Sequence, residues 1–485
     1  MKFLTTLTQV SHAGYPFILF YFIACIGIVL IFSRPQTAFL FSVFCLAAKN
    51  FHAAVYTRTP FLGPYLNLND LLLWIALLAM ITKYMKEREK IWAPEILLAI
   101  FGVVIIGDFQ SLFMYGAKYQ VLQRIWSTAI FPLMFLVGAN MVKHEKEARD
   151  FYKILFIGVV FASIQHLYYV YFQQNVILKY TGYSQIRTIS YITSGGASLL
   201  IGSVFASRNL KLNNLHKAIY YIGLALIGSS VLLSFTRGLW ITALIAIVIL
   251  PFLIQKKDVL IISKKKLVIT VLMGIVILLL IFPRLQLAKQ VNKRISSFTE
   301  TKALKHSYQG RKIGQENEIN IWLNGSIIFG YGSVLPADFL KKGEFKGAYY
   351  HVAYSTYLSH YGLIGLIIYQ ILLPILTINV GRRYYLKYSK TIGGVVSLIG
   401  VACAFMYILG FMWSNCYLVA TTQNYGLIYG VVWGLNRGDK MRRSVNLGPN
   451  PSLVRKKNTE HSNLSLYKKV FISLKRVNSN SKCTI

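Results

Sequence analysis

Four short polar segments of this sequence contain the residue types that can hold a phosphate group or transfer a proton. Arg187 precedes the pair Gly195-Gly196, and Arg237 lies in the turn Ser234-Phe235-Thr236-Arg237-Gly238. Arg311 follows a glycine in a long polar stretch, and His351 stands where the sequence becomes apolar again. Arginine presents a planar fork that fits two phosphate oxygens, and histidine titrates near neutral pH, so it can accept a proton from a hydroxyl group. These residue types favour a diphosphate site with a base nearby.

The segment Tyr349–Gly365 carries the strongest of these signals. His351 and Ser355 are four residues apart, so a helix places them on one face with Tyr354 close by. His360, nine residues after His351, is interpreted as structural. Taken singly, each Arg or His also fits a simpler role as a polar side chain at the boundary between water and lipid.

The composition excludes a water-soluble enzyme. Of 485 residues, 55% are hydrophobic and only 14% are charged, and the 52 Lys and Arg outnumber the 16 Asp and Glu, for a net charge of +36. Soluble domains carry about 25% charged residues, and the apolar residues here come in blocks of about 18 or more, long enough to cross a bilayer. The basic residues lie between these blocks rather than on one folded face, so no nucleic-acid partner is predicted. The five cysteines form no CxxC pattern.

The apolar blocks predict an all-α polytopic membrane protein with about 12–13 transmembrane helices. The blocks lie at 15–33, 37–56, 66–82, 93–108, 123–142, 151–172, 189–207, 217–235, 238–255, 267–283, 350–379, 391–413 and 416–435. The predicted organisation is an N-terminal helix bundle (1–283), a large extracytoplasmic loop (284–349), C-terminal membrane helices (350–435) and a basic, disordered cytoplasmic tail (436–485). A strict count of the loops puts the N-terminus outside, unless one of the first two blocks is re-entrant or does not span the membrane.

Every second loop is rich in Lys and Arg, which predicts that these loops face the cytoplasm. The rich loops contain Lys83 to Lys90, Lys143 to Arg149, Arg208 to Lys217, Lys256 to Lys266 and Arg382 to Lys390. The four segments with Arg187, Arg237, Arg311 and His351 then lie on the outer side. The outer loop holds eleven Lys and Arg against five acids, a surplus that orientation does not require and that would attract an anionic substrate. The tail, with twelve Lys and Arg against two acids, is expected to lie near anionic lipid headgroups.

Several kinds of chemistry lack their residues. No carboxylate is expected near the centre of a membrane helix, because Asp70, Glu95 and Asp108 fall at the ends of the apolar blocks. That disfavours an ion-coupled transporter. The sequence contains no D-x-D pair, no Walker A sequence and no His/Cys cluster with metal-ligand spacing, so neither a metal nor another cofactor is predicted.

The same segments carry a family likeness. The sequence resembles the O-antigen ligase and Wzy-type polysaccharide polymerase superfamily of bacterial inner-membrane proteins. The likeness lies in the turn Ser234–Gly238, the series Gly310-Arg311, Trp322 and Gly330-Tyr331-Gly332, and His351 followed by Gly362 and Gly365. Asp70 also falls where the family tends to have an aspartate. One position departs: Val352 follows His351 where the family usually has Asn, so Tyr354 or Ser355 must orient the acceptor.

The resemblance implies an inverting, metal-independent glycosyl transfer at the outer face of the bacterial cytoplasmic membrane. The implied donor is a glycan on undecaprenyl diphosphate, and the implied acceptor is a sugar hydroxyl. Arg237 and Arg311 would bind the diphosphate with help from Arg187, and His351 would be the general base. A flippase and a chain-length regulator of the same pathway are the implied protein partners.

Two members of the superfamily remain open, with a slight preference for the polymerase of O-antigen or exopolysaccharide. A ligase would transfer the glycan to lipid A core instead, and the altered motif and long basic tail depart from the ligase pattern. From another class, a flippase for lipid-linked sugars should show related halves and polar residues at the membrane midplane. Neither feature is seen in the sequence. A non-enzymatic scaffold is the least favoured reading.

Overall fold

The structure is a computed structural model that describes residues 22–48, 68–172, 196–206, 213–233, 237–254, 301–335, 353–410 and 419–446. Within these ranges every regular element is a helix, and the only β-type pairing is an isolated bridge between Ser326 and Gly330. The fold class is therefore all-α, as the apolar blocks predict. The chain divides by its internal contacts into Met1–Asn436 and Arg437–Ile485.

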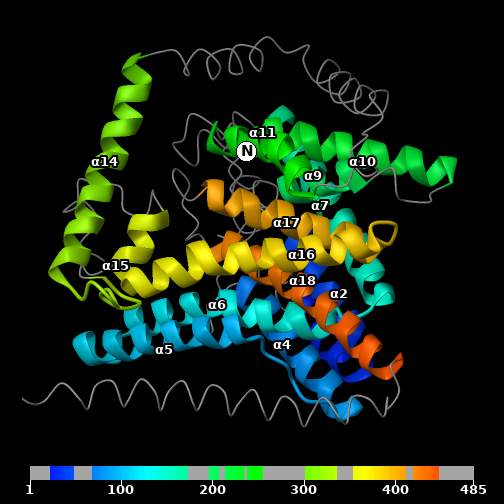
Figure 1. The fold of residues 1–485 in the computed structure, drawn as a ribbon, viewed down its shortest axis with the longest axis horizontal. Coiled ribbons are helices and arrows are strands. Elements are labelled where there is room, and N and C mark those ends of the chain that lie inside the picture. Colours follow the sequence, from blue (N-terminus) through cyan, green and yellow to red (C-terminus); the bar gives the residue numbers. More distant parts are fainter. Residues whose placement is uncertain are drawn as a thin grey trace, which may run out of the picture. The chain divides into compact units, whose positions relative to one another are not determined.

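The helices of the described part follow the predicted blocks closely (Figure 1). They are Phe22–Ser33, α2 (Pro35–Ala48), α4 (Leu68–Glu87), α5 (Glu95–Tyr115), α6 (Tyr119–Met141), α7 (Glu145–Phe172), α9 (Ala197–Ala206), α10 (Asn214–Leu232), α11 (Arg237–Ile254), α14 (Thr301–Asn324), α15 (Ala353–Gly365), the π-helix η5 (Leu366–Leu372), α16 (Leu373–Tyr388), α17 (Ile392–Gly410) and α18 (Val419–Asn446). The predicted block at 267–283 lies outside the described residues.

Some helix ends differ from the predicted blocks. Helix α5 continues to Tyr115, seven residues past the predicted end at 108, so Asp108 lies within the helix rather than at its end. Helix α7 begins at Glu145, before the predicted block at 151–172. Its first turn is charged, so a search for apolar residues does not detect it. Helix α18 continues to Asn446, so the first residues of the predicted disordered tail are helical. In that stretch Arg443 pairs with Asp439 at 2.7 Å.

Five helices in the described part are long and apolar enough to cross a membrane. They are Glu95–Tyr115, Glu145–Tyr168, Asn214–Leu232, Tyr354–Tyr388 and Ile392–Leu409, with three shorter apolar helices at Phe22–Ser33, Pro35–Ala48 and Leu239–Ile254. The longest, Tyr354–Tyr388, joins α15, η5 and α16 into one discontinuous element. These helices support an all-α membrane protein, and the full number of spans stays a prediction.

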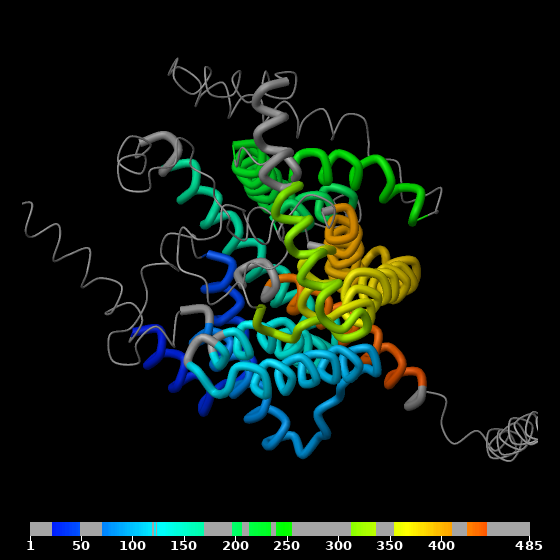
Figure 2. Tube along the Cα trace, turned by 90° about the vertical axis from the view of Figure 1, so that its left-hand side faces the viewer, coloured from blue at the N-terminus to red at the C-terminus, as the bar shows by residue number. Residues whose placement is uncertain are grey.

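The core forms where these helices pack side by side. Helix α17 packs against α16 and α9, and α7 packs against α2 and α10. Figure 2, turned by 90°, shows α16 in yellow and α17 in orange next to each other and nearly end-on. Most of the buried side chains in both hydrophobic clusters are aliphatic or aromatic, and the second cluster is rich in tyrosine.

Glycines bring α6 and α18 close together. Gly426, Gly430 and Gly434 recur every fourth residue, and a Cβ at Gly430 would lie 2.2 Å from the carbonyl oxygen of Phe135 on α6. A Cβ at Gly138 on α6 would in turn lie 2.5 Å from the Leu427 carbonyl oxygen. Small residues at this spacing allow the two backbones to touch, which is a common way for helices to associate in a membrane.

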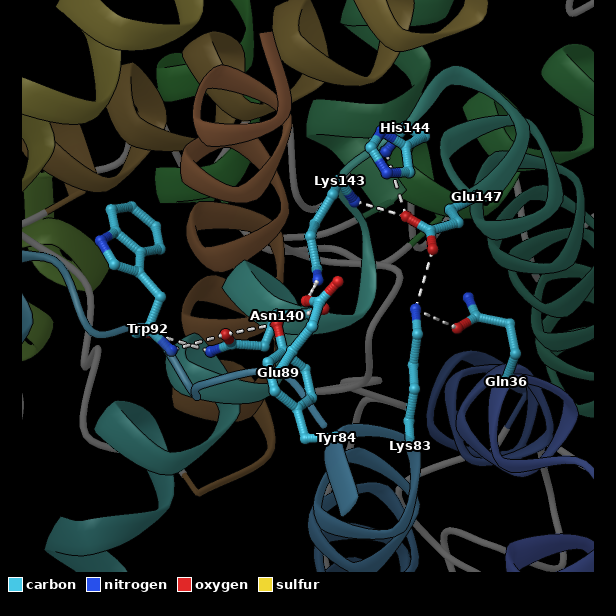
Figure 3. Close-up of polar contacts among 9 residues, drawn as sticks. All are labelled: Gln36, Lys83, Tyr84, Glu89, Trp92, Asn140, Lys143, His144 and Glu147. Atoms are coloured by element: carbon cyan, nitrogen blue, oxygen red, sulfur yellow. Dashed lines mark hydrogen bonds and ion pairs between the residues drawn. The ribbon is translucent and has the colours of Figure 1, made fainter. Parts of the chain in front are cut away.

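Two of the loops rich in Lys and Arg, Lys83 to Lys90 and Lys143 to Arg149, meet at one end of their helices, which we call the basic end (Figure 3). Lys83 on α4 pairs with Glu147 on α7 at 2.8 Å, and Lys143 pairs with Glu89 at 2.5 Å. Glu147 also accepts hydrogen bonds from the amides of Lys143 and His144, which caps the start of α7. Burial opposes the ammonium form of Lys143, but its contacts with Glu89 and Tyr84 outweigh that effect and raise its pKa.

Further contacts at the basic end involve two more connections between helices. Lys86 donates to the carbonyl oxygen of Phe32 at 2.7 Å, at the end of the helix Phe22–Ser33 and just before the start of α2. The Glu145 carboxylate accepts from the amides of Ile392 and Gly393, at the start of α17. Three of the five basic loops named in the sequence are thus joined at one end, as their alternation along the chain predicts.

Asn140 is the buried centre of this end, and replacing it should destabilise the fold. Its side chain accepts from the Trp92 amide at 2.9 Å and donates to the Trp92 carbonyl oxygen at 2.8 Å, in addition to its bond with Tyr84. We expect Asn140→Ala to lower the free energy of unfolding by about 2–3 kcal/mol, because it leaves buried backbone groups unpaired. Unfolding by SDS titration in mixed micelles measures the change. Asn320→Ala, at an exposed site on α14, is the control and should change it by less than about 0.5 kcal/mol. Equal effects of the two substitutions would contradict this role for Asn140.

Candidate functional site

The structure describes the sequence-predicted site residues unevenly. Arg187 and His351 lie outside the described residues. Arg237 is the first residue of α11, and Arg311 lies within α14; the structure describes the backbone of both but not their side chains. Tyr354 and Ser355 lie in the first turn of α15, which begins two residues after His351.

Helices α14 and α15 pack against each other, and this contact relates two of the motifs (Figure 1). Gln315 on α14 is in hydrogen-bond contact with the Tyr354 hydroxyl. Glu318, three residues further along α14, accepts from Ser355 and from Thr356, the latter at 3.1 Å. Because later residues of α14 meet later residues of α15, the turn of α14 that carries Arg311 leads toward the start of α15.

Ser355 and Tyr354 differ in their surroundings. Ser355 is fully buried, and its hydroxyl donates to Glu318. Tyr354 is only partly buried and contacts Gln315. Of the two residues predicted to orient an acceptor, Tyr354 is therefore the one with a surface left for a ligand.

The glycine motif after α14 forms a turn that lies against α15. Helix α14 ends at Asn324, and the indole of Trp322 donates to the carbonyl oxygen of Ile327 at 3.0 Å, which fixes the start of the turn. Gly330 and Gly332 have φ of 70° and 97°, values that L side chains rarely adopt. The amphipathic stretch after Arg311 predicts a helix and the closely spaced glycines predict a turn after it, and the structure has both.

The turn also breaks the helix that it touches. At Gly362 the backbone has φ 62° and ψ −159°, and the helical bonds across this point are replaced by bonds to the turn. These are Tyr331 N to Ser359 O (2.9 Å), Gly332 N to His360 O (2.7 Å), Leu363 N to Ile327 O (3.0 Å) and Ile364 N to Ile328 O (3.2 Å). We call this pairing of residues 327–332 with 359–364 the backbone clasp. It gives hydrogen-bond partners to backbone groups that the break at Gly362 leaves without helical bonds.

Helix α5 supports the clasp from its other side. The Ser333 amide donates to the Gly107 carbonyl oxygen at 3.2 Å, and the Val334 amide donates to the Ser111 hydroxyl at 3.0 Å. The Asp108 carboxylate accepts from the Ser333 hydroxyl. His360 is fully buried, and its Nδ1 lies 2.9 Å from the Gly332 carbonyl oxygen, in keeping with a structural role.

The arginine turn between α10 and α11 is short. Helix α10 ends at Leu232 and α11 begins at Arg237, with the indole of Trp240 donating to the Val231 carbonyl oxygen at 3.2 Å. Near the end of α10, Ser230 lies 2.5 Å from Nδ1 of buried His166. The Trp240 bond joins the end of α10 to the first turn of α11, and the Ser230 contact joins the end of α10 to α7.

Asp70 is the remaining residue of the family likeness, and it lies on α4. Asp70 is buried in the first turn of α4 and accepts from the indole of Trp126 at 2.8 Å. In the described ranges no three His, Cys, Asp or Glu side chains come together as a set of metal ligands.

Sequence reasoning missed Glu318 and the contribution of α5. Glu318 is one of five acids in a long polar loop, and nothing near it in the sequence indicates burial. The spacing Gly107-x-x-x-Ser111, two small residues on one face of an apolar helix, was the available signal for a close backbone contact on α5.

No protein-family model matches this chain, and no curated protein matches it either. The likeness to the polymerase and ligase superfamily therefore rests on the motif residues and their order.

Proposed function

We propose that this protein is a membrane glycosyltransferase, a polysaccharide polymerase that transfers a glycan from undecaprenyl diphosphate to a sugar acceptor. The observation that carries the proposal is the register of α14 on α15. The Arg311 motif and the His351 motif are forty residues apart, yet Gln315 meets Tyr354 and Glu318 meets Ser355. Glycosyl transfer requires the arginine that binds the donor phosphate and the base that activates the acceptor hydroxyl to lie close together.

The division of labour follows from the residue types. The arginines at 187, 237 and 311 supply fixed positive charge for the diphosphate, which gains charge as its bond to the anomeric carbon breaks. His351 accepts the proton of the attacking hydroxyl, and the new glycosidic bond forms with inversion. Tyr354 orients the acceptor. None of these residue types needs a metal to play these roles.

The basic end supports an outer location for the site. Loops rich in Lys and Arg face the cytoplasm as a rule, and in this chain several of them meet at the end that contains Lys83, Lys143 and Lys86. The clasp and the start of α11 belong to the opposite ends of their helices. The proposed site is thus at the outer face of the cytoplasmic membrane.

The direct test is reconstitution of the purified protein in vesicles that contain undecaprenyl-diphosphate-linked oligosaccharide. We expect glycans that lengthen by whole repeats, in the presence of EDTA as in its absence. Transfer only when lipid A core is added would identify the ligase. No new glycosidic bond under either condition would refute the proposal.

A flippase is the second candidate, because the discontinuous helix at Gly362 resembles the broken helices of transporters. The clasp is evidence against a flippase. The backbone groups that lose their helical bonds at the break are bonded to the turn, so they are not open to a ligand. Movement of the lipid-linked sugar across the vesicle membrane without bond formation would favour the flippase.

Arg237→Lys should reduce transfer on the order of 100-fold, because an ammonium group cannot reproduce the bidentate fork. The rate of glycan elongation in the vesicles measures the loss. Arg149→Lys is the matched control, since Arg149 is an exposed residue of α7 near the basic end. Near-normal elongation by Arg237→Lys would remove Arg237 from the diphosphate site.

A further inference from the structure

Glu318 is a buried acid that the proposed mechanism does not use. Its side chain is on α14 and only 1% exposed. Thr356 donates to one carboxylate oxygen at 3.1 Å, and Ser355 donates to the other. Burying a carboxylate is costly unless hydrogen bonds replace its water, so this arrangement stabilises one specific contact between α14 and α15.

The two hydroxyl donors make the contact specific for one register. Ser355 and Thr356 are successive residues of a helix, so their side chains diverge by about 100° and the carboxylate must lie between them. A shift of α14 along α15 by one residue removes one of the two donors. Apolar side chains could hold the helices together as firmly, but a buried polar contact selects one alignment.

The face of α14 that holds Glu318 also holds the position of the motif arginine. Residues 311, 315 and 318 are separated by four and three, so they share one face of α14. Lys312 and Glu316 lie on the exposed side, where they pair at 3.7 Å with more than half of each side chain exposed. The contact of Glu318 thus fixes the height at which position 311 stands relative to the start of α15.

We infer that Glu318 is a positioning residue: it locks α14 to α15 in one register and so sets where position 311, proposed to bind phosphate, stands relative to the start of α15, two residues after the proposed base His351. The inference rests on the proposed function. Glu318 touches neither donor nor acceptor and acts only through the alignment of the two helices.

The first test is a set of three variants in the vesicle assay. Glu318→Ala should lower kcat on the order of 100-fold, the effect of a displacement of about 1 Å in a reacting pair, while KM for the lipid-linked donor changes less than about threefold. Glu318→Gln keeps an acceptor for one hydroxyl and should recover most of kcat. Glu316→Ala, two residues away on the exposed side, should match the unaltered protein. A Glu318→Ala variant with normal kcat, or a Gln variant no better than Ala, would overturn the inference.

A second measurement keeps the inference testable if Glu318→Ala does not accumulate. Thr356→Val preserves the shape of the side chain but removes the 3.1 Å bond, and it should lower kcat several-fold without loss of protein. An unchanged kcat in Thr356→Val would contradict the role of the Glu318 contact in fixing the register of α14 on α15.

The alignment itself can be measured without activity. Cysteines at Gln315 and Tyr354, whose side chains are in contact, should be joined readily by a short bifunctional thiol reagent in a chain without its native cysteines. Adding Glu318→Ala should reduce the cross-linked fraction severalfold, and Glu316→Ala should not. Loss of cross-linking with no glycosyl transfer by the unaltered protein would leave the lock standing and refute the proposed function. Unchanged cross-linking would refute the lock alone.

Discussion

Gly362→Ala should disrupt the backbone clasp, with a loss of at least about 3–4 kcal/mol in the free energy of unfolding. The backbone at Gly362, φ 62° and ψ −159°, lies in a region that is essentially restricted to glycine, and a residue with a Cβ is strained there by about 1–3 kcal/mol. A Cβ would also lie 2.3 Å from the Ile328 carbonyl oxygen, which belongs to the clasp.

The overlap cannot be relieved by a side-chain movement, because the neighbouring atoms are backbone. The same Cβ would lie 2.7 Å from the Gly330 amide nitrogen, and a Cβ at Gly330 would lie 2.6 Å from the Gly362 nitrogen. The clasp must therefore open, which leaves four backbone bonds unmade. Limited proteolysis near residues 325–335 and SDS titration in mixed micelles both measure the outcome.

Gly102→Ala is the matched control. Gly102 lies in α5, and a Cβ there would have no atom within 4 Å, so alanine should be neutral or stabilise the helix by up to about 1 kcal/mol. If Gly362→Ala unfolded at the same SDS fraction as Gly102→Ala and resisted proteolysis equally, the clasp would not be a determinant of the fold.

The helices were predictable from sequence because crossing a membrane requires long apolar segments and little else. The blocks at 93–108, 391–413 and 416–435 correspond to α5, α17 and α18. Their ends were not predictable to the same degree. Polar first turns such as Glu145 to Lys146 are helical through capping and tertiary contacts, which apolarity does not report.

The motif turn was predictable in part. The spacing of Gly330 and Gly332 indicates a turn, and Gly362 and Gly365 belong to the resemblance, but sequence alone does not show that these segments pair with each other. The discontinuous helix and the buried carboxylate of Glu318 depend on contacts between residues about 30–40 positions apart along the chain. Hydrophobic periodicity contains no information on such pairs, and only the packed structure brings them together.

His351→Ala should abolish glycan elongation while the protein still inserts and accumulates. A general base contributes about 10² to 10⁴ in rate, and His360, the other histidine of this segment, is fully buried against Gly332 and cannot replace it. The product of the vesicle assay, separated by glycan length, measures the loss. Donor binding should persist, because the arginines that hold the diphosphate are unchanged.

Two other histidines separate a catalytic effect from a structural one. His144→Ala, exposed at the basic end, should leave elongation normal. His360→Ala should lower the yield of folded protein, because its Nδ1 contact at 2.9 Å supports the clasp, and the folded fraction should retain measurable elongation. Elongation by His351→Ala at the rate of His144→Ala would exclude His351 as the base. Loss of folded His351→Ala protein on the scale of His360→Ala would assign His351 to the fold, so activity per folded molecule decides between the two roles.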